Sequence, residues 1–255
     1  MIIWITGAST GLGRELAAQY ARAGHKVIVS ARSSEGLESL RTEAGDMIHP
    51  LPLDITDAAG VRSAFERIVN EIGLPDLCVL NAGTHLKDSA LDIDPAHHER
   101  IMQINYHGTI NCLAAVIAGY KTRGSGHVAV VSSVAGYRGL PYASAYGATK
   151  AALINLCESL QPELAAAGIR LSVVNPGFVR TPLTDKNDFE MPFLMEVEDA
   201  ARSLRQGLDS GRFEITFPKR FTWILKFLRI LPIALYLRMT RNLLNADQGR
   251  SDSDS

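Results

Sequence analysis

The sequence predicts an α/β fold, a doubly wound parallel sheet of about seven strands with helices on both faces. Three observations predict it. Short apolar or β-branched segments alternate with longer segments of helical pattern. Several short segments, such as Val128–Val131, are apolar almost throughout, as expected for strands that helices cover on both sides. A glycine-rich turn also follows the first such segment and leads directly into a helix.

The expected strands and helices alternate along the chain. The strands are Ile2–Thr6, Lys26–Ala31, Met47–Leu51, Leu77–Leu80, His127–Ser132, Ile169–Asn175 and Phe213–Phe217. The helices are Leu12–Gly24, Ser34–Ala44, Asp57–Ile72, Pro95–Arg123, Ser144–Ala167 and Val197–Ser210. This order predicts right-handed βαβ units. Because no repeat, heptad or linker interrupts it, we expect one domain over residues 1–217.

Composition narrows the possible functions. The 255 residues are 46% hydrophobic and carry a formal net charge of −1, which gives no reason to expect a nucleic-acid partner. Cys78, Cys112 and Cys157 are widely spaced in apolar segments, so we expect reduced, buried thiols rather than disulfides or a metal site. The N-terminus lacks signal-peptide features, and no apolar run is long enough to span a membrane, so we expect a cytoplasmic protein.

The turn at Thr6–Gly13 has the features of a phosphate-binding turn of the Rossmann type. Gly7 allows a sharp turn, Gly11 lets the backbone approach a pyrophosphate, and Gly13 lets the helix pack closely on the strand. The helix N-terminus supplies amide donors to the anion. The residues between the glycines that we expect to contact the cofactor are Ser9, Thr10 and Leu12.

The end of the second strand indicates which dinucleotide binds. A carboxylate here would accept hydrogen bonds from the ribose of NAD, but the sequence has Arg32 and Ser33 after Ala31. A guanidinium beside a hydroxyl suits a 2′-phosphate, which an acid would repel. We therefore expect NADP(H) rather than NAD(H). The alternative is that Arg32 is only a solvated loop residue.

Tyr146 and Lys150 form the candidate proton-transfer pair. They lie four residues apart near the start of a helix and so share a face. A nearby ammonium favours the phenolate and lowers the pKa of a tyrosine, which can then exchange a proton with a carbonyl or alcohol. The spacing alone arises by chance in about one such chain in five, by composition. Ser133 at the end of an apolar strand and Asn105 inside a long helix add polar groups at positions that favour a site.

Together these motifs resemble the short-chain dehydrogenase/reductase family, in its short single-domain branch. The resemblance covers residues 1 to about 217. It rests on the Thr6–Gly13 turn, Asp54-Ile55, Asn81-Ala82-Gly83, Asn105, Ser133, Tyr146–Lys150 and the run Pro176–Thr181, in the family's order and spacing.

The resemblance implies a role for each matching residue. Tyr146 would be the general acid and base, Ser133 would hold the substrate oxygen, and Lys150 would lower the tyrosine pKa and bind the nicotinamide ribose. Asn105 would hold a water that links Lys150 to solvent. The remaining matches imply contacts to the cofactor. Asp54 and Ile55 would flank the adenine, Asn81 and Gly83 would line the adenosine side, and Val179 and Thr181 would fix the nicotinamide carboxamide. Further cofactor contacts are implied for Ala82, Pro176 and Gly177. The family also implies a homodimer or homotetramer.

The segment after Thr181 is similar to the lid over the substrate in this family. It offers the apolar side chains Leu183, Phe189, Met191, Phe193, Leu194 and Met195, opposite Val134, Tyr137, Leu140 and Tyr142. Without a cluster of Arg or Lys, the segment favours a lipophilic carbonyl or secondary alcohol as substrate. The same side chains could instead pack on the protein itself.

The C-terminal region departs from the family's pattern. Residues 218–245 form an apolar, basic extension, which we expect to be helical and to be divided by Pro232. Aromatic and aliphatic residues beside Lys and Arg are typical of helices that lie at a membrane surface. Packing on the protein's own core or on a second subunit accounts for the same composition, and both interpretations stay open. The polar residues 246–255 are expected to be disordered.

The sequence therefore favours an oxidoreductase that transfers hydride between NADP(H) and a lipophilic carbonyl/alcohol pair. The alternative is a protein of the same fold that binds NADP(H) without turnover, as a sensor or as a scaffold at a lipid surface. The substrate, the direction of the reaction and the oligomeric state stay open.

Overall fold

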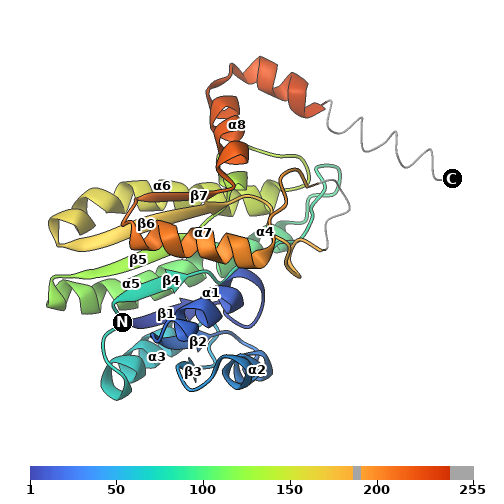
Figure 1. The fold of residues 1–255 in the computed structure, drawn as a ribbon. Helices are drawn as coiled ribbons and strands as arrows, with labels where there is room; N and C mark the ends of the chain where they lie inside the picture. The colour runs from blue at the N-terminus through green and yellow to red at the C-terminus, as the bar shows by residue number, and fades with distance from the viewer. Residues whose placement is uncertain (186–190, 242–255) are drawn as a thin grey trace.

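The computed structural model describes residues 1–185 and 191–241. The described chain forms one sheet of seven parallel strands in the order β3-β2-β1-β4-β5-β6-β7 (Figure 1). The strands are β1 (Ile2–Thr6), β2 (Lys26–Ser30), β3 (Ile48–Pro50), β4 (Leu77–Leu80), β5 (Gly126–Val131), β6 (Ile169–Pro176) and β7 (Glu214–Phe217). The predicted fold class is therefore confirmed.

Helices cover both faces of this sheet (Figure 1). One face carries α1 (Gly11–Arg22), α2 (Ser34–Ala44) and α7 (Val197–Asp209). The other carries α3 (Ala58–Glu71), α5 (Gly108–Arg123) and α6 (Ser144–Ala166). The short helix α4 (Pro95–Met102) lies beside α6.

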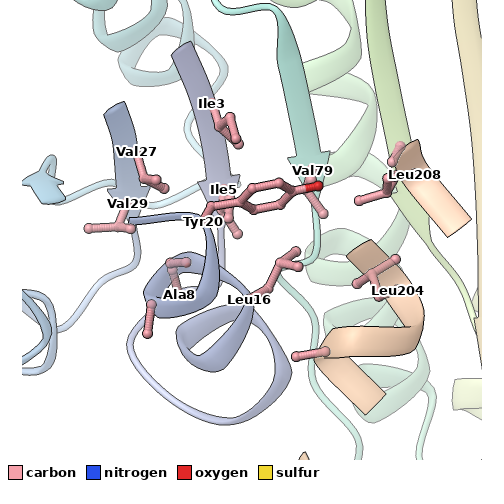
Figure 2. Close-up of a cluster of buried hydrophobic side chains, with 14 of the residues drawn as sticks. Ile3, Ile5, Ala8, Leu16, Tyr20, Val27, Val29, Val79, Leu204 and Leu208 are labelled. Atoms are coloured by element: carbon pink, nitrogen blue, oxygen red, sulfur yellow. The ribbon is translucent and has the colours of Figure 1, made fainter. Parts of the chain in front are cut away.

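The alternation of side chains along a strand produces two separate cores. Ile3 and Ile5 of β1 point to the face of α1 and α7, where Figure 2 shows Leu16 and Tyr20 of α1 packed against them. Trp4, between them, points to the opposite face and packs on Phe65 of α3 at 5.7 Å between ring centroids. Because both faces of the strand are buried, β1 has to be apolar throughout, as the sequence indicated.

The predicted helix Pro95–Arg123 is one continuous element with an irregular turn. A π-helical segment, Gln103–His107, joins α4 to α5 and contains the fully buried Asn105. Such segments widen a helix by one residue and are frequent at functional sites. The other predicted bounds agree with the structure to within one or two residues. The three cysteines are buried free thiols, as predicted.

The C-terminal extension begins at the end of β7. Helix α8 (Lys219–Ile230) leaves the edge of the sheet, and after Pro232 a second helix follows over residues 233–241 (Figure 1). The division at Pro232 was predicted. Among the described residues, no helix is long and apolar enough to cross a membrane. Two sequence-based expectations, the lid residue Phe189 and disorder of residues 246–255, fall outside the described residues.

The packing of α7 gives a first prediction. Leu204 is fully buried between α7 and the sheet, close to Leu16 (Figure 2). Replacing Leu204 with alanine removes this apolar contact and leaves a cavity, so the free energy of unfolding should fall by about 2–5 kcal/mol. Urea denaturation would measure it, with the exposed neighbour Arg202→Ala as the control. A loss no larger than that of the control would contradict the packing described here.

Candidate active site

The carboxyl ends of the strands open into one cleft. The strand order reverses between β1 and β4, so the connections from these two strands lead in opposite directions and leave a crevice at the sheet edge. The cleft has a volume of about 1040 Å³ and is lined by residues that follow β1 to β6. This volume is at the upper end of the range for small-molecule sites.

Nearly all of the predicted site residues line this cleft. They are Gly7, Ser9, Thr10, Gly11, Leu12, Arg32, Ser33, Asp54, Ile55, Asn81, Ala82, Gly83, Ser133, Tyr146, Lys150, Pro176, Gly177, Val179 and Thr181. Gly13 and Asn105 do not reach the cleft. Both are buried beneath its floor, where they support residues that do.

The glycine turn requires its glycines for steric reasons. Gly7 and Gly11 have φ angles of +67° and +56°, which other residues rarely adopt. A Cβ on Gly7 would also lie 2.6 Å from the Ala82 Cα, and one on Gly13 would lie 2.5 Å from the Gly7 carbonyl oxygen. The turn is therefore a tight backbone cradle at the start of α1, with no acidic residue in that helix's first turn.

Asn81 fixes this cradle to β4. Its side-chain amide donates to the carbonyl oxygens of Thr6 and Gly7, both at 3.1 Å. The Thr6 hydroxyl in turn accepts from the backbone N–H groups of Asn81 and Ala82 at 3.0 and 3.2 Å. The resemblance implied that Asn81 lines the adenosine side of the cleft. It does line the cleft, but its amide group also ties the turn to the neighbouring strand.

At the far end of the cleft, Arg32 and Ser33 follow β2. The Ser33 hydroxyl accepts a hydrogen bond from the Gly36 N–H at 3.1 Å and caps α2. Asp54 lies across from Arg32, and its pKa is held below the usual value by hydrogen bonds from the Thr56 N–H and hydroxyl, with a smaller effect from the Arg32 charge. The exposed guanidinium of Arg32 is therefore positioned at the cleft wall beside a helix N-terminus.

This half of the cleft fits a dinucleotide. The bare backbone at Gly11 faces the Thr181 side chain across the cleft, and a Cβ there would meet it at 3.1 Å. The N-terminus of α1 opens onto it, and within the described structure the N-cap residue Thr10 makes no side-chain capping bond that would occupy the first N–H groups.

Ser133, Tyr146 and Lys150 meet at the other half of the cleft. Ser133 follows β5, while Tyr146 and Lys150 lie one turn apart on α6. The Lys150 ammonium is buried, lies 5.5 Å from the centre of the Tyr146 ring and donates to the Val131 carbonyl oxygen at 2.9 Å. The Ser133 hydroxyl accepts from the Ala135 N–H at 3.1 Å and also bonds with the Tyr146 side chain.

The pKa of Tyr146 differs from the sequence-based expectation. We expected the Lys150 charge to lower it. Instead, burial in the cleft raises the pKa of Tyr146 to about 12, and the bond with Ser133 offsets only part of this rise. Burial also lowers the pKa of Lys150 to about 8. Although the ammonium faces the ring, desolvation of the Tyr146 phenol and of the Lys150 ammonium is the largest cause of both pKa shifts. The phenol therefore holds its proton at neutral pH.

Asn105 supports this group from below. Its Oδ1 accepts from the Thr84 N–H at 2.8 Å, and its Nδ2 donates to the Thr84 carbonyl and to the Thr149 hydroxyl at 3.0 and 3.1 Å. The Thr149 hydroxyl donates to the Tyr146 carbonyl at 2.7 Å. The π-helical segment thus connects the loop after β4 to the helix that carries Tyr146. The water expected from the resemblance stays a prediction.

The loop after β6 closes the cleft from the third side. Thr181 lines the cleft, and its N–H donates to the Thr184 hydroxyl at 3.0 Å. Val179 pairs with Met195 in a short parallel bridge, so the segment beyond the undescribed residues returns to the same loop. Leu183 lines the cleft as expected, whereas Phe193 stacks on Phe221 of α8 at 5.8 Å.

The expected wall opposite the lid is only partly a cleft wall. Val134 and Tyr137 are buried in the core on the α6 face. The Tyr137 hydroxyl donates to Glu214 of β7 at 2.6 Å, so this side chain holds the sheet edge. These residues were expected either to line the substrate site or to pack on the protein itself. Val134 and Tyr137 pack on the protein.

Sequence reasoning missed three residues around Tyr146. His85 lies with its ring centre 4.7 Å from that of Tyr146, and Arg100 of α4 lines the cleft. Asp88 accepts from the Ser144 N–H, the Ser144 hydroxyl and the Ala145 N–H at 3.0, 2.8 and 2.6 Å. It therefore caps the start of α6 from a separate loop. A cap at such a distance in sequence leaves no local signal.

Comparison with known proteins gives a consistent result. Residues 1–191 match the family described as short chain dehydrogenase. An uncharacterized oxidoreductase of Myxococcus xanthus is 37% identical over 242 residues, which cover 94% of this chain and 96% of that protein.

Solved structures share the fold. A short-chain dehydrogenase from Streptomyces avermitilis matches with a TM-score of 0.80 and 25% identity, over 100% of this chain and 98% of that one. A 3-ketoacyl-(acyl-carrier-protein) reductase from Brucella melitensis, solved with NADH, matches with a TM-score of 0.78 and 26% identity, over 85% and 96% of the two chains.

The cap on α6 gives a second prediction. Replacing Asp88 with alanine removes the acceptor for two backbone N–H groups, so the free energy of unfolding should fall by about 1–2 kcal/mol at neutral pH. Partial burial raises the pKa of Asp88, but hydrogen bonds from Ala145 and Ser144 outweigh this and hold it below the usual value. The stabilisation is therefore complete above a pH of about 4 and is lost below it.

Denaturation of the wild type and the Asp88→Ala variant between pH 7 and pH 3 would measure this. Asp92→Ala, an exposed acid in the same loop, is the matched control. A stability difference that persists unchanged at pH 3 would show that the carboxylate is not the stabilising group.

Proposed function

The chain is an oxidoreductase of the short-chain dehydrogenase/reductase family, and we propose that it transfers hydride between NADP(H) and a lipophilic carbonyl/alcohol pair with Tyr146 as the general acid and base. One observation carries this proposal. The Ser133 and Tyr146 side chains and the buried Lys150 meet at one end of a cleft whose other end is a glycine cradle.

The raised pKa of Tyr146 favours a defined role in the reduction direction. A bound nicotinamide supplies the hydride to the carbonyl carbon. The Tyr146 phenol, which keeps its proton at neutral pH, donates that proton to the carbonyl oxygen as the hydride arrives. The Ser133 hydroxyl bonds with the phenol, which supports a role for it in holding the same oxygen. One carbonyl, one hydride and one proton give one alcohol.

Lys150 stabilises the charge that this transfer leaves. Once the phenol has lost its proton, the Lys150 ammonium, 5.5 Å from the centre of the ring, is a positive charge that favours the phenolate. In the oxidation direction the same charge favours the phenolate that accepts the alcohol proton. Because burial lowers the pKa of Lys150 to about 8, the ammonium loses its proton as the pH rises above that value, and its stabilisation of the phenolate is then lost.

The preference for NADP(H) is supported by the end of the cleft beyond β2. Arg32 is exposed there, beside the N-terminus of α2, where both the guanidinium and the helix dipole favour a phosphate. Arg32 is the second residue after β2, in the region where an NAD-binding site has a carboxylate. The Brucella melitensis reductase, at 26% identity, was solved with NADH, so the family alone does not decide the cofactor.

A lipophilic substrate is supported by the surroundings of Tyr146. The loop that contacts Tyr146 through His85 carries the exposed side chains Leu86, Leu91 and Ile93. Leu183 lines the cleft. Exposed apolar groups beside a cleft indicate an apolar ligand.

The mechanism predicts a large effect at Tyr146. The Tyr146→Phe variant should lose about 10²- to 10⁴-fold in kcat, because phenylalanine cannot transfer the proton. NADPH should still bind, as measured by the change in its fluorescence. Turnover would be followed by NADPH absorbance on aldehydes and ketones of increasing chain length, with Tyr106→Phe as the control for loss of a hydroxyl.

A Tyr146→Phe variant as active as the wild type would refute the mechanism. NADPH binding without turnover of any carbonyl or alcohol by the wild type would instead favour a sensor or scaffold.

The cofactor assignment predicts a change in selectivity. Arg32→Glu should weaken NADPH binding at least about tenfold and weaken NADH binding far less, because a carboxylate repels the 2′-phosphate and accepts from a ribose hydroxyl. Dissociation constants for both cofactors would be measured by fluorescence titration. Arg41→Glu, which changes the same charge at the end of α2, is the control. An unchanged ratio of the two constants would refute NADP(H) selectivity through Arg32.

A further inference from the structure

The C-terminal arm, residues 219–241, presents an outward apolar face. Trp223, Phe227 and Ile230 lie on one side of α8, at i, i+4 and i+7, and are 71%, 61% and 76% exposed. Ile233 and Leu237 continue the exposed apolar surface on the second helix. Large side chains exposed together in this way are unusual on a protein without a binding partner.

The arm is held firmly in this orientation. Arg138 donates to the carbonyl oxygens of Leu228, Arg229 and Leu231 at 2.6, 3.2 and 3.0 Å, at the C-terminal end of α8. The same guanidinium lies 4.1 Å from the centre of the Tyr236 ring, so one cation holds both helices.

Two further contacts fix the inner side of the arm. Lys226 forms an ion pair with Glu214, which also accepts from Tyr137. Phe221 packs on Phe178, in the loop that leads to the cleft residues Val179 and Thr181. The inner face is thus already used, and the outer apolar face is available for a partner.

Charge identifies the partner. Residues 217–244 contain six Lys or Arg and no acidic residue. Lys219, Arg220 and Arg229 are exposed on α8, and Arg238 and Arg241 on the second helix. Apolar side chains flanked by cations match the acyl and headgroup layers of an anionic bilayer. A second copy of the chain, meeting this face through a two-fold axis, would oppose like charges without a compensating acid in the same segment.

We propose that the C-terminal arm docks on anionic lipid bilayers, with Trp223, Phe227 and Ile230 inserted at the interface. In this arrangement the arm lies along the membrane surface; no helix among the described residues is long and apolar enough to cross a bilayer. Because its inner side packs on Phe178 and on Phe193 of the returning lid segment, docking brings that side of the cleft toward the lipid. Binding does not depend on the reaction proposed for Tyr146.

The two tryptophans make a direct test possible. The chain has only Trp4, which is fully buried, and Trp223. When the full chain is titrated with phosphatidylcholine vesicles that contain phosphatidylglycerol, Trp223 emission should shift to shorter wavelength and resist acrylamide quenching. Pure phosphatidylcholine vesicles should bind about tenfold or more weakly, and added salt should weaken binding to the anionic ones. Co-sedimentation measures the same affinity, and Trp223→Phe should abolish the optical signal while still sedimenting.

Matched variants separate the contributions of the apolar face and the charges. Phe227→Asp with Ile230→Asp, and separately Arg220→Glu with Arg229→Glu, should each weaken binding to anionic vesicles about tenfold or more. The control for the first pair is Met47→Asp with Val69→Asp, also exposed apolar residues.

The control for the charge pair is Arg62→Glu with Lys121→Glu, exposed cations on α3 and α5. Both controls should bind vesicles like the wild type. Equal binding by the arm variants and the controls would overturn the proposal, as would failure of the wild type to bind. A dimer in light scattering that Phe227→Asp with Ile230→Asp dissociates, without vesicle binding, would assign the face to a second copy instead.

Discussion

The junction of β1 and β4 determines the position of the whole site. These strands lie side by side and parallel, but the chain continues from them toward opposite edges of the sheet. The backbone after each strand therefore diverges, and the space between becomes the cleft. The Thr6 hydroxyl and the Asn81 amide hold the two strand ends together across this point. These side-chain bonds extend the backbone pairing of β1 with β4, which ends at Thr6 and Leu80, and they fix the glycine cradle relative to the residues after β4.

Burial affects titratable groups mainly at one end of the cleft. At the other end, the groups that line it are the backbone of the glycine turn and, after β2, the exposed Arg32. At Tyr146 and Lys150, desolvation acts on side chains that can change charge, and it favours the neutral form of both. In the protein alone, the Tyr146 phenol is therefore protonated at neutral pH, and the pKa of the Lys150 ammonium lies well below its usual value.

Local patterns in the sequence were sufficient for the fold, and together with the family resemblance they pointed to residues that line one cleft. Strand and helix periods predicted the parallel sheet, and the glycine turn and the Tyr146–Lys150 spacing predicted residues that do meet at one cleft. What escaped prediction depends on contacts between distant segments. Asp88 caps a helix that begins 56 residues later. The π-helical turn at Asn105 and the burial that sets the pKa of Tyr146 are properties of the packed structure, and no short pattern encodes them.

The contacts that hold the C-terminal arm on the protein also keep its apolar outer face exposed. A helix that packs with one face on its own protein usually turns a polar face outward. Here the inward face uses Phe221, and the outward face has Trp223 and Phe227, so burial within the chain cannot explain both. Arg138 and Glu214 hold the arm in this position, through bonds to the end of α8 and to Lys226. Arg138 lies five residues after Ser133. Tyr137, which lies between these two residues, donates a hydrogen bond to Glu214. The outward face is thus maintained by the segment that also contains Ser133, so the orientation of the arm and one wall of the cleft depend on the same stretch of chain.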